Sequence, residues 1–137
     1  MLERIVVVAG LAALIALSVI VMRLYARQRT KLVKAQPGPL MLARLGAQPD
    51  GRPTIVAFST PSCAACHTAQ TPALAHVAQQ LDVRVVHVDA AHQPEVAHAF
   101  GIMTVPSTAV LDGWGNVTVI NHGFAPSQQL ARQLQTA

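Results

Sequence analysis

The longest uninterrupted hydrophobic stretch lies near the start of the chain. From Ile5 to Met22 there are eighteen residues without a charge, and no polar face recurs at helical spacing. That length is close to the minimum that crosses the hydrocarbon core of a bilayer as a helix. We therefore predict a transmembrane helix over residues 1–24, with residues 5–22 in contact with lipid. A cleaved signal peptide is the alternative, since Ala16-Leu17-Ser18 resembles a cleavage site, although the apolar run continues beyond it.

Further along, shorter hydrophobic runs alternate with turn signals. Thr54 to Phe58 and Val83 to Val88 are short and rich in β-branched residues, which is typical of buried strands. From Cys63 to Leu81, apolar residues recur at the spacing of one helix face, and Pro72 is expected to disturb that helix by removing a hydrogen bond. The remaining pattern predicts a helix over 94–100, strands over 108–111 and 117–120, and a final helix from Pro126 onward.

Charge is distributed unevenly and separates a linker from a domain. Residues 1–35 carry a net charge of +5, whereas the rest of the chain carries −1. The basic residues after the apolar stretch, together with the turn signal at Ala35–Pro39, indicate a linker over residues 25–39 and a single domain over residues 40–137. Leu40 to Leu45 predicts a short element whose type the pattern does not fix. A nearly neutral domain argues against nucleic acid as a partner.

The basic residues also predict an orientation. One of them precedes the apolar stretch, Arg4, and five follow it: Arg23, Arg27, Arg29, Lys31 and Lys34. The positive-inside rule then places the domain on the cytoplasmic side of the cell membrane, attached by a single span. A solvated linker that touches anionic lipid is the simpler interpretation of the same basic segment, and it is compatible with this orientation.

The chain contains two cysteines, Cys63 and Cys66, separated by two residues. A secreted domain that depends on structural disulfides usually carries several cysteines dispersed along its length. The spacing therefore favours a redox pair or a metal-binding pair. No zinc site with four cysteine or histidine ligands at the usual paired spacing can be assembled from this sequence, so we expect no resident metal ion.

The predicted order β-α-β-α-β-β-α, with Cys-x-x-Cys at the first strand-to-helix junction and Val-Pro before the hairpin, resembles the thioredoxin family. This resemblance implies an α/β thioredoxin-like fold with a central mixed sheet flanked by helices. It also implies thiol-disulfide oxidoreductase activity on protein substrates, with the Cys63–Cys66 disulfide as redox centre and no separate cofactor. The matching positions run from Thr54 to the C-terminus and include Val56, Phe58, Cys63, Cys66, Val88-Asp89, Phe100-Gly101-Ile102, Thr104-Val105-Pro106-Ser107 and Gly123.

The resemblance also implies roles for individual residues. If Cys63 begins the helix, unpaired backbone N–H groups and the helix dipole stabilise its thiolate, which is the nucleophile in disulfide exchange. Cys66, one turn later, is expected to resolve the mixed disulfide. The segment that binds substrate is expected to be Thr104, Val105 and Pro106, with a cis Val105–Pro106 peptide bond as in the family.

Two residues near the cysteine pair depart from the thioredoxin pattern, and a third is a candidate for tuning the reactivity of the pair. Ala57 stands where many thioredoxins have a buried aspartate beneath the cysteines, and Ser62 stands where a tryptophan often precedes the first cysteine. These departures leave the substrate and the direction of electron flow open. His67 is a candidate for tuning the pKa of the Cys63 thiol, with a neutral imidazole that has no such role as the alternative.

Two further functions are compatible with the motif. Cys63-Ala64-Ala65-Cys66-His67 matches the attachment signature of c-type haem, which would define an electron-transfer protein. That interpretation requires haem attachment outside the cytoplasm and leaves the Thr104–Pro106 segment unexplained. The other is a redox-inert thioredoxin-like binding module, or a carrier that holds a soft metal such as Cu(I) or Zn between the two thiolates.

Overall fold

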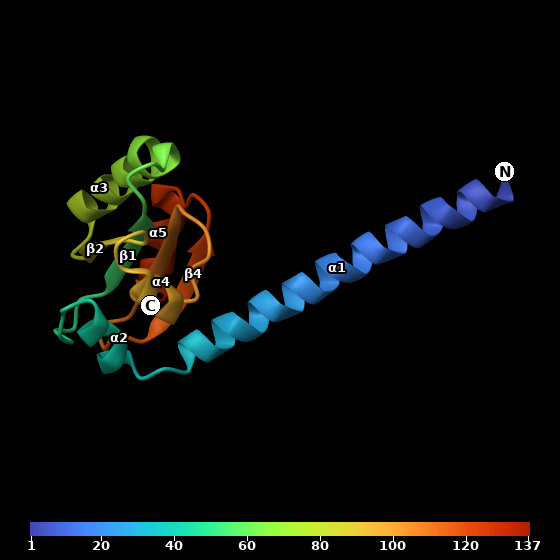
Figure 1. Cartoon of the computed structure of the whole chain (residues 1–137). Helices are drawn as coiled ribbons and strands as arrows, with labels where there is room; N and C mark the ends of the chain where they lie inside the picture. Colours follow the sequence, from blue (N-terminus) through green and yellow to red (C-terminus); the bar gives the residue numbers. More distant parts are fainter. The chain divides into compact units, whose positions relative to one another are not determined.

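The computed structural model describes residues 1–137, which divide into two compact units, Met1–Leu32 and Val33–Ala137. The first unit belongs to helix α1 (Leu2–Lys34), the long helix at the N-terminus in Figure 1. This helix is long and apolar enough to cross a membrane. It continues past Met22 through arginine, glutamine and lysine residues with good helix propensity, so most of the basic segment is helical.

The second unit is built from four strands and the helices that cover them. The predicted order of strands and helices is confirmed, and the element of undetermined type near Leu40 is a helix. In chain order the elements are α2 (Gly38–Arg44), β1 (Thr54–Ser59), η1 (Cys66–Gln70), α3 (Thr71–Gln80), β2 (Arg84–Asp89), α4 (Pro94–Ala99), β3 (Ser107–Leu111), β4 (Val117–His122) and α5 (Ser127–Gln135).

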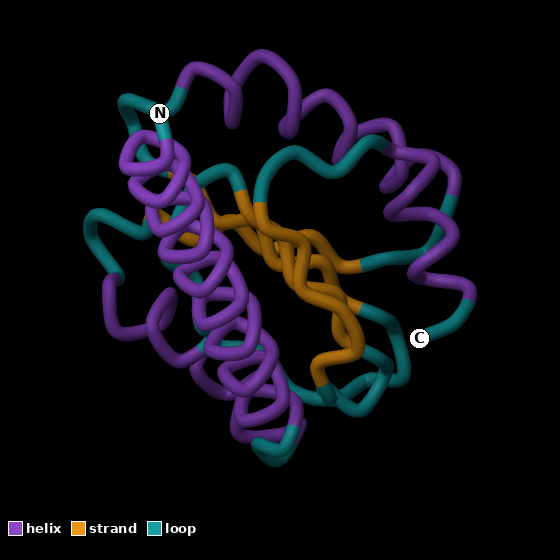
Figure 2. The backbone as a smooth tube through the Cα atoms, turned by 90° about the vertical axis from the view of Figure 1, so that its right-hand side faces the viewer, coloured by secondary structure: helices purple, strands orange, loops and turns teal.

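The sheet is mixed and has the strand order β2-β1-β3-β4. β1 pairs in parallel with β2 and antiparallel with β3, and β3 pairs antiparallel with β4. Figure 2 shows the strands as a twisted central layer. β1 is an inner strand and is buried from Thr54 to Phe58, as its short β-branched sequence predicts. Its carboxyl end leads directly into the segment that contains the two cysteines.

Each face of the sheet is covered by a separate hydrophobic core, because alternate residues of β1 point to opposite faces. On one face, Val56 and Phe58 pack with residues of α2 and α4, and the rings of Phe58 and Phe100 have centroids 5.4 Å apart at an interplanar angle of 54°. On the other face, Ile55 and Ala57 pack with residues of α3 and α5. The strand that carries the cysteines at its end is therefore held from both sides.

A network of side-chain amides lies at the edge of the second core. Asn121 of β4 donates hydrogen bonds to Thr108 Oγ1 at 3.0 Å and to Gln133 Oε1 at 2.8 Å. Its carbonyl oxygen accepts hydrogen bonds from the side-chain amides of Gln129 at 3.0 Å and Gln133 at 2.8 Å. The buried amide of Asn121 is thus fully hydrogen-bonded, and these bonds join α5 to the sheet.

Helix α2 packs against the turn between β3 and β4, and glycines make this contact possible. A Cβ atom on Gly38 would lie 2.6 Å from the backbone nitrogen of Asn116, and one on Gly115 would lie 2.5 Å from the carbonyl oxygen of Gly38. Gly115 also has a φ of +89°, which favours glycine. Because Leu111 pairs with Thr54, this turn lies at the amino end of β1, opposite the cysteines.

Candidate redox site

Cys63 and Cys66 are joined by a disulfide, with their Cα atoms 5.3 Å apart. They lie between β1 and α3, at the carboxyl end of β1. The backbone N–H of Cys63 donates to the carbonyl oxygen of Thr60 at 3.1 Å, which turns the chain from the strand toward the helix. The structure therefore brings together the two cysteines that the sequence singled out.

The two cysteines differ in exposure and in their position on the helix. Cys63 is half-buried, whereas Cys66 is only 3% exposed. The backbone N–H of Cys66 donates to the sulfur of Cys63 at 3.2 Å, as an N–H of the first helical turn does to a capping side chain. In the reduced protein this N–H can donate to the Cys63 thiolate, the form of cysteine that acts as the nucleophile in disulfide exchange.

His67 is exposed and hydrogen-bonds to the loop before the cysteines. Its Nε2 lies 3.3 Å from the carbonyl oxygen of Pro61. Because a carbonyl oxygen only accepts hydrogen bonds, Nε2 carries the hydrogen in this contact. The imidazole thus ties the first helical turn to the chain leading into Cys63, and its influence on the Cys63 thiol stays a prediction.

The helix after Cys66 begins with a single π turn, η1. The N–H and the hydroxyl of Thr71 both donate to the carbonyl oxygen of Cys66, the hydroxyl at 2.9 Å. Pro72 has no N–H with which to continue the regular pattern, so the disturbance expected at Pro72 takes the form of a wider turn on its N-terminal side. That turn ends at Gln70, whose side chain is buried.

The Val105–Pro106 peptide bond is cis, as the resemblance implies. The next residue, Ser107, pairs with Phe58 near the end of β1, so this loop and the disulfide lie at the same edge of the sheet. The carbonyl oxygen of Thr104 accepts a hydrogen bond from the Ser107 hydroxyl at 2.7 Å. Neither the N–H nor the carbonyl of Val105 bonds to another backbone group of the chain, which leaves both available to a ligand.

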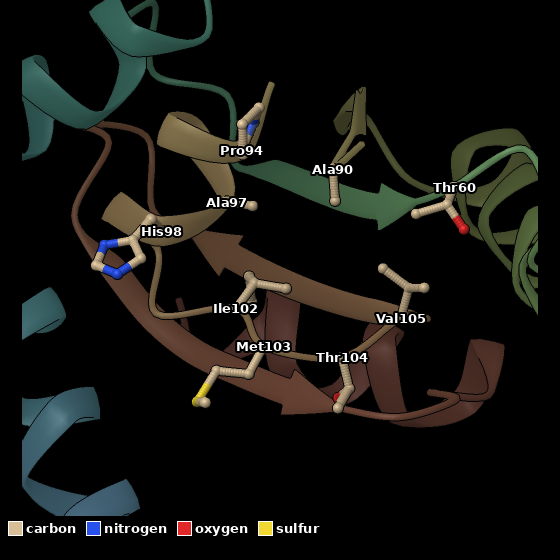
Figure 3. Close-up of a pocket in the computed structure, with 9 residues that line it drawn as sticks. All are labelled: Thr60, Ala90, Pro94, Ala97, His98, Ile102, Met103, Thr104 and Val105. Atoms are coloured by element: carbon tan, nitrogen blue, oxygen red, sulfur yellow. The ribbon is translucent and has the colours of Figure 1, made fainter. Parts of the chain in front are cut away.

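A groove of about 570 Å³ runs beside this loop and is lined mainly by apolar side chains. Figure 3 shows the 102–105 segment along one side of the groove, with helix α4 on the other and Thr60 toward one end. Thr60 is the residue whose carbonyl holds the Cys63 N–H, so the groove adjoins the disulfide loop. Its lining residues are Thr60, Ala90, Pro94, Ala97, His98, Ile102, Met103, Thr104 and Val105.

The loop between β2 and α4, which borders the groove, is fixed by an aspartate. Asp89 accepts a hydrogen bond from the backbone N–H of Ala91 at 2.9 Å, and its carboxylate lies 2.8 Å from Nδ1 of His92. The hydrogen bond from His92, more than the backbone N–H groups, lowers the pKa of the Asp89 carboxyl below its usual value. A charged Asp89 therefore orders the entry into α4.

Position 57, on the face of β1 that packs with α3 and α5, is occupied by a small apolar residue. Ala57 is 4% exposed and pairs across the sheet with Thr108 on β3 and His87 on β2. The Thr108 hydroxyl accepts its hydrogen bond from Asn121. No group of three or more histidine, cysteine, aspartate or glutamate side chains is arranged to hold a metal ion.

Sequence reasoning missed one buried polar residue next to this site, Gln70. Its side-chain amide forms two hydrogen bonds with the backbone of Ala125, in the loop between β4 and α5. The signal was present, because Gln70 lies four residues before Leu74 and seven before Val77, on the buried face of the same helix. A polar residue in a core position of a helix predicts a specific hydrogen-bond partner.

Comparison with known proteins agrees with this geometry. Residues 47–136 match the family model for thioredoxin. Thioredoxin 1 of Nostoc sp. is 29% identical over 85 residues, covering 61% of this chain and 78% of its own. The SPbeta prophage-derived thioredoxin-like protein YosR of Bacillus subtilis is 28% identical over 83 residues, covering 59% of this chain and 98% of its own.

Solved structures share the fold at lower sequence identity. A thioredoxin from Halobacterium salinarum superimposes with a TM-score of 0.59 at 20% identity, covering 64% of this chain and 76% of that one. Chloroplastic thioredoxin z gives a TM-score of 0.59 at 22% identity, with 71% and 85% covered. The fold and the Cys63–Cys66 pair support thiol-disulfide oxidoreductase chemistry. The chain belongs to the thioredoxin family.

Proposed function

We propose that this protein is a membrane-tethered thiol-disulfide oxidoreductase in which Cys63 attacks and Cys66 resolves. The observation that carries the proposal is the asymmetry of the pair: Cys63 is half-buried and its sulfur accepts an N–H, whereas Cys66 is buried behind it. An attacking thiol needs access and a stabilised thiolate, and a resolving thiol needs only to reach the first sulfur. The disulfide itself is the redox group, and no further cofactor takes part.

In the reducing direction, the Cys63 thiolate attacks one sulfur of a substrate disulfide. A mixed disulfide forms, and the departing substrate thiolate takes up a proton. The Cys66 thiolate then attacks the Cys63 sulfur and expels the second substrate thiolate. Two electrons pass from the protein to the substrate, and the Cys63–Cys66 disulfide remains. The oxidising direction is the reverse sequence, and the redox partner sets which one operates.

Substrate recognition in this proposal uses backbone groups and the apolar groove. The free N–H and carbonyl of Val105 can pair with an extended polypeptide, as an added strand pairs with a sheet edge. Side chains of that polypeptide would enter the groove between the Thr104–Val105 segment and α4. Protein thiols and disulfides therefore fit the site better than small polar thiols, which fill no groove.

The tether in this proposal is α1, and the domain faces the cytoplasm. Support comes from the length of the apolar helix and from the basic residues that follow residue 22. A C-terminal alkaline phosphatase fusion tests the side, because the enzyme is active only outside the cytoplasm. An inactive phosphatase fusion and a fluorescent C-terminal GFP fusion are expected. Active phosphatase would instead place the domain outside and reopen the c-type haem hypothesis, for which a Soret band is the direct measurement.

The roles of the cysteines are tested by trapping in cells. Cys66→Ala cannot resolve the intermediate, so it should accumulate mixed disulfides with cellular proteins on a non-reducing gel. Cys63→Ala should accumulate none, and the double variant is the control. If Cys63→Ala trapped partners and Cys66→Ala did not, the assigned roles would be reversed. If neither single variant trapped a partner and the purified protein reduced no protein disulfide, the oxidoreductase proposal would fail.

A further inference from the structure

Gln70 forms a two-point contact with a residue far away in the sequence. Its Nε2 donates to the carbonyl oxygen of Ala125 at 3.0 Å, and its Oε1 accepts from the N–H of Ala125 at 3.0 Å. Gln70 is 3% exposed and Ala125 is fully buried. The amide therefore pairs with one residue's backbone in the way that two strand residues exchange hydrogen bonds. We call this contact the Gln70–Ala125 pair.

Both residues of the Gln70–Ala125 pair lie close to the candidate redox site, one in sequence and one through a hydrogen bond. Gln70 is the last residue of the π turn that begins at Cys66. Ala125 lies two residues after Gly123, whose N–H donates to the carbonyl oxygen of Pro106 at 2.9 Å. Two hydrogen-bonded links thus connect three segments, which carry the resolving cysteine, the cis-proline and the loop between β4 and α5.

The π turn places the side chain of Gln70 inside the domain. The carbonyl oxygen of Cys66 accepts both the N–H and the hydroxyl of Thr71, so the turn contains one residue more than an α-helical turn would. Gln70 closes this turn with its side chain inside the domain. A buried amide at this point is stable only when both its donor and its acceptor are used, and the backbone of Ala125 supplies both partners.

Phe124 lies between the two fixed residues of the β4–α5 loop. Phe124 is 49% exposed, although Gly123 and Ala125 on either side are hydrogen-bonded to Pro106 and Gln70. An aromatic ring held at the surface by restrained backbone is suited to contact a protein partner, because little conformational freedom is lost on binding. The ring is thus presented by the same loop that hydrogen-bonds to Pro106.

We propose that Gln70 is a positioning residue: through the Gln70–Ala125 pair it fixes the Phe124 loop relative to the dithiol, and so sets how tightly protein substrates dock. The inference rests on the proposed oxidoreductase function and adds a determinant of substrate binding to it. Gln70 does not touch the reacting sulfurs in this role. Its loss should weaken the docking of a folded protein disulfide while leaving the reaction of the dithiol with a small disulfide intact.

The test compares Gln70→Met with wild type, using the full chain in detergent micelles. Methionine fills a similar volume without the two hydrogen bonds, each of which is worth about a tenfold change in an equilibrium. We expect KM for insulin to rise by about tenfold to a hundredfold, with kcat and the rate with a small aromatic disulfide unchanged. Gln79→Leu, an exposed position on α3, is the matched control and should behave as wild type.

Gln70→Glu separates the two hydrogen bonds. A carboxylate can still accept the Ala125 N–H but cannot donate to the Ala125 carbonyl, and its buried charge faces that carbonyl oxygen, so KM should rise at least as far as in Gln70→Met. A KM for insulin within twofold of wild type in Gln70→Met would overturn the inference. An equal loss of activity toward insulin and toward the small aromatic disulfide would also overturn the inference. Such a result would mean that the substitution changes the reactivity of the dithiol rather than the docking of protein substrates.

Amide hydrogen exchange measures the stability of the Gln70–Ala125 pair directly. It needs neither an activity assay nor a folded variant. In the wild-type protein, the Ala125 amide should be protected and should open together with the amides of the Cys66–Thr71 turn. Fast, independent exchange at Ala125 would contradict the inference whatever the kinetics. If the wild-type chain reduced no disulfide, the proposed function would fail while the exchange data still reported on the Gln70–Ala125 pair.

Discussion

The two ends of β1 are built on different principles. At its carboxyl end lie the disulfide, the cis-proline loop and the groove, where backbone groups of Val105 are unpaired and Cys63 is partly exposed. At its amino end, α2 meets the β3–β4 turn through glycines that leave no space for a Cβ atom, and Asp50 pairs with Arg52 and Arg84. Groups available for binding therefore lie at the carboxyl end of β1, whereas close contacts and ion pairs fill the amino end.

The crowded glycine turn should give the largest change in stability. Gly115→Ala introduces a Cβ that meets Gly38 and Leu42 and forces alanine into a φ of +89°. We expect the free energy of unfolding to fall by about 2 to 4 kcal/mol, with the disulfide-exchange rate per folded molecule unchanged. Chemical denaturation followed by circular dichroism measures the first quantity.

Gly46→Ala is the matched control for that variant. Gly46 has a φ of +69°, but no atom lies within 4 Å of the position that a Cβ would take, so only the conformational cost of about 1 kcal/mol applies. Equal losses in the two variants would show that crowding at the α2 contact contributes nothing, and the contrast between the two ends would be weakened.

At the carboxyl end, Ala57→Asp tests the consequence of placing a carboxyl beneath the cysteines. Ala57 is buried, so burial should raise the pKa of the new carboxyl in the folded state above its unfolded value of about 3.9. The folded state then binds the proton more tightly, and stability falls as pH rises above about 4 toward the folded pKa. Relative to Ala57→Asn, we expect the free energy of unfolding of Ala57→Asp to fall by about 2 kcal/mol between pH 4 and pH 7, measured by chemical denaturation at each pH. A loss independent of pH would mean that the carboxyl reaches solvent.

Thr54, at the amino end of β1, offers an opportunity to gain stability. Its hydroxyl is fully buried and has no hydrogen-bond partner. Thr54→Val removes that group at nearly constant volume, so unfolding free energy should rise by about 1 kcal/mol. Thr118→Val is the control, because the Thr118 hydroxyl donates to the carbonyl of Val110 at 3.0 Å and its loss should destabilise. A destabilised Thr54→Val would point to an unrecognised partner for the hydroxyl.

The surface ion pairs at the amino end should give the smallest effect. The hydrogen bond from Arg52 lowers the pKa of the Asp50 carboxyl below its usual value, and Arg84 adds to this. A folded-state pKa that is lowered stabilises the protein above the unfolded value near 3.8, and this stabilisation is lost as pH falls through the folded pKa.

Asp50→Asn should therefore lower Tm slightly at pH 7 and not at pH 2. Asp82→Asn is the control, since the Asp82 carboxylate lies 3.9 Å from Arg52 and is 82% exposed, and it should change Tm even less. A difference between Asp50→Asn and wild type that persisted at pH 2 would require another cause, such as the hydrogen bond from the Arg52 backbone N–H.

Most of the fold was predictable because its signals are local. The β-branched run before Cys63 and the proline at position 94 each specify an element through neighbouring residues. The cysteine pair was predictable for the same reason, since its chemistry depends on a spacing of three. The cis bond at Pro106 was implied by family resemblance and is present in the structure.

The parts that could not be predicted depend on contacts between distant residues. Gln70 and Ala125 are 55 residues apart, and nothing in either local sequence names the other. The π turn forms because Thr71 donates to the Cys66 carbonyl and Pro72 has no N–H to donate. The spacing of hydrophobic residues along the sequence does not reveal this hydrogen-bond pattern. The Gly38–Gly115 approach likewise requires knowing that α2 covers this particular turn.

The amides around Asn121 have a consequence for how the last helix finds its place. A purely hydrocarbon contact would let α5 shift by one turn along the sheet at modest cost, because apolar surfaces tolerate many alignments. Asn121 accepts only the alignment in which both Gln129 and Gln133 reach it. Any other alignment of α5 leaves the buried amide of Asn121 without hydrogen-bond partners. The free energy lost in this way exceeds what apolar packing in that alignment would gain. One asparagine thus specifies the register of the C-terminal helix.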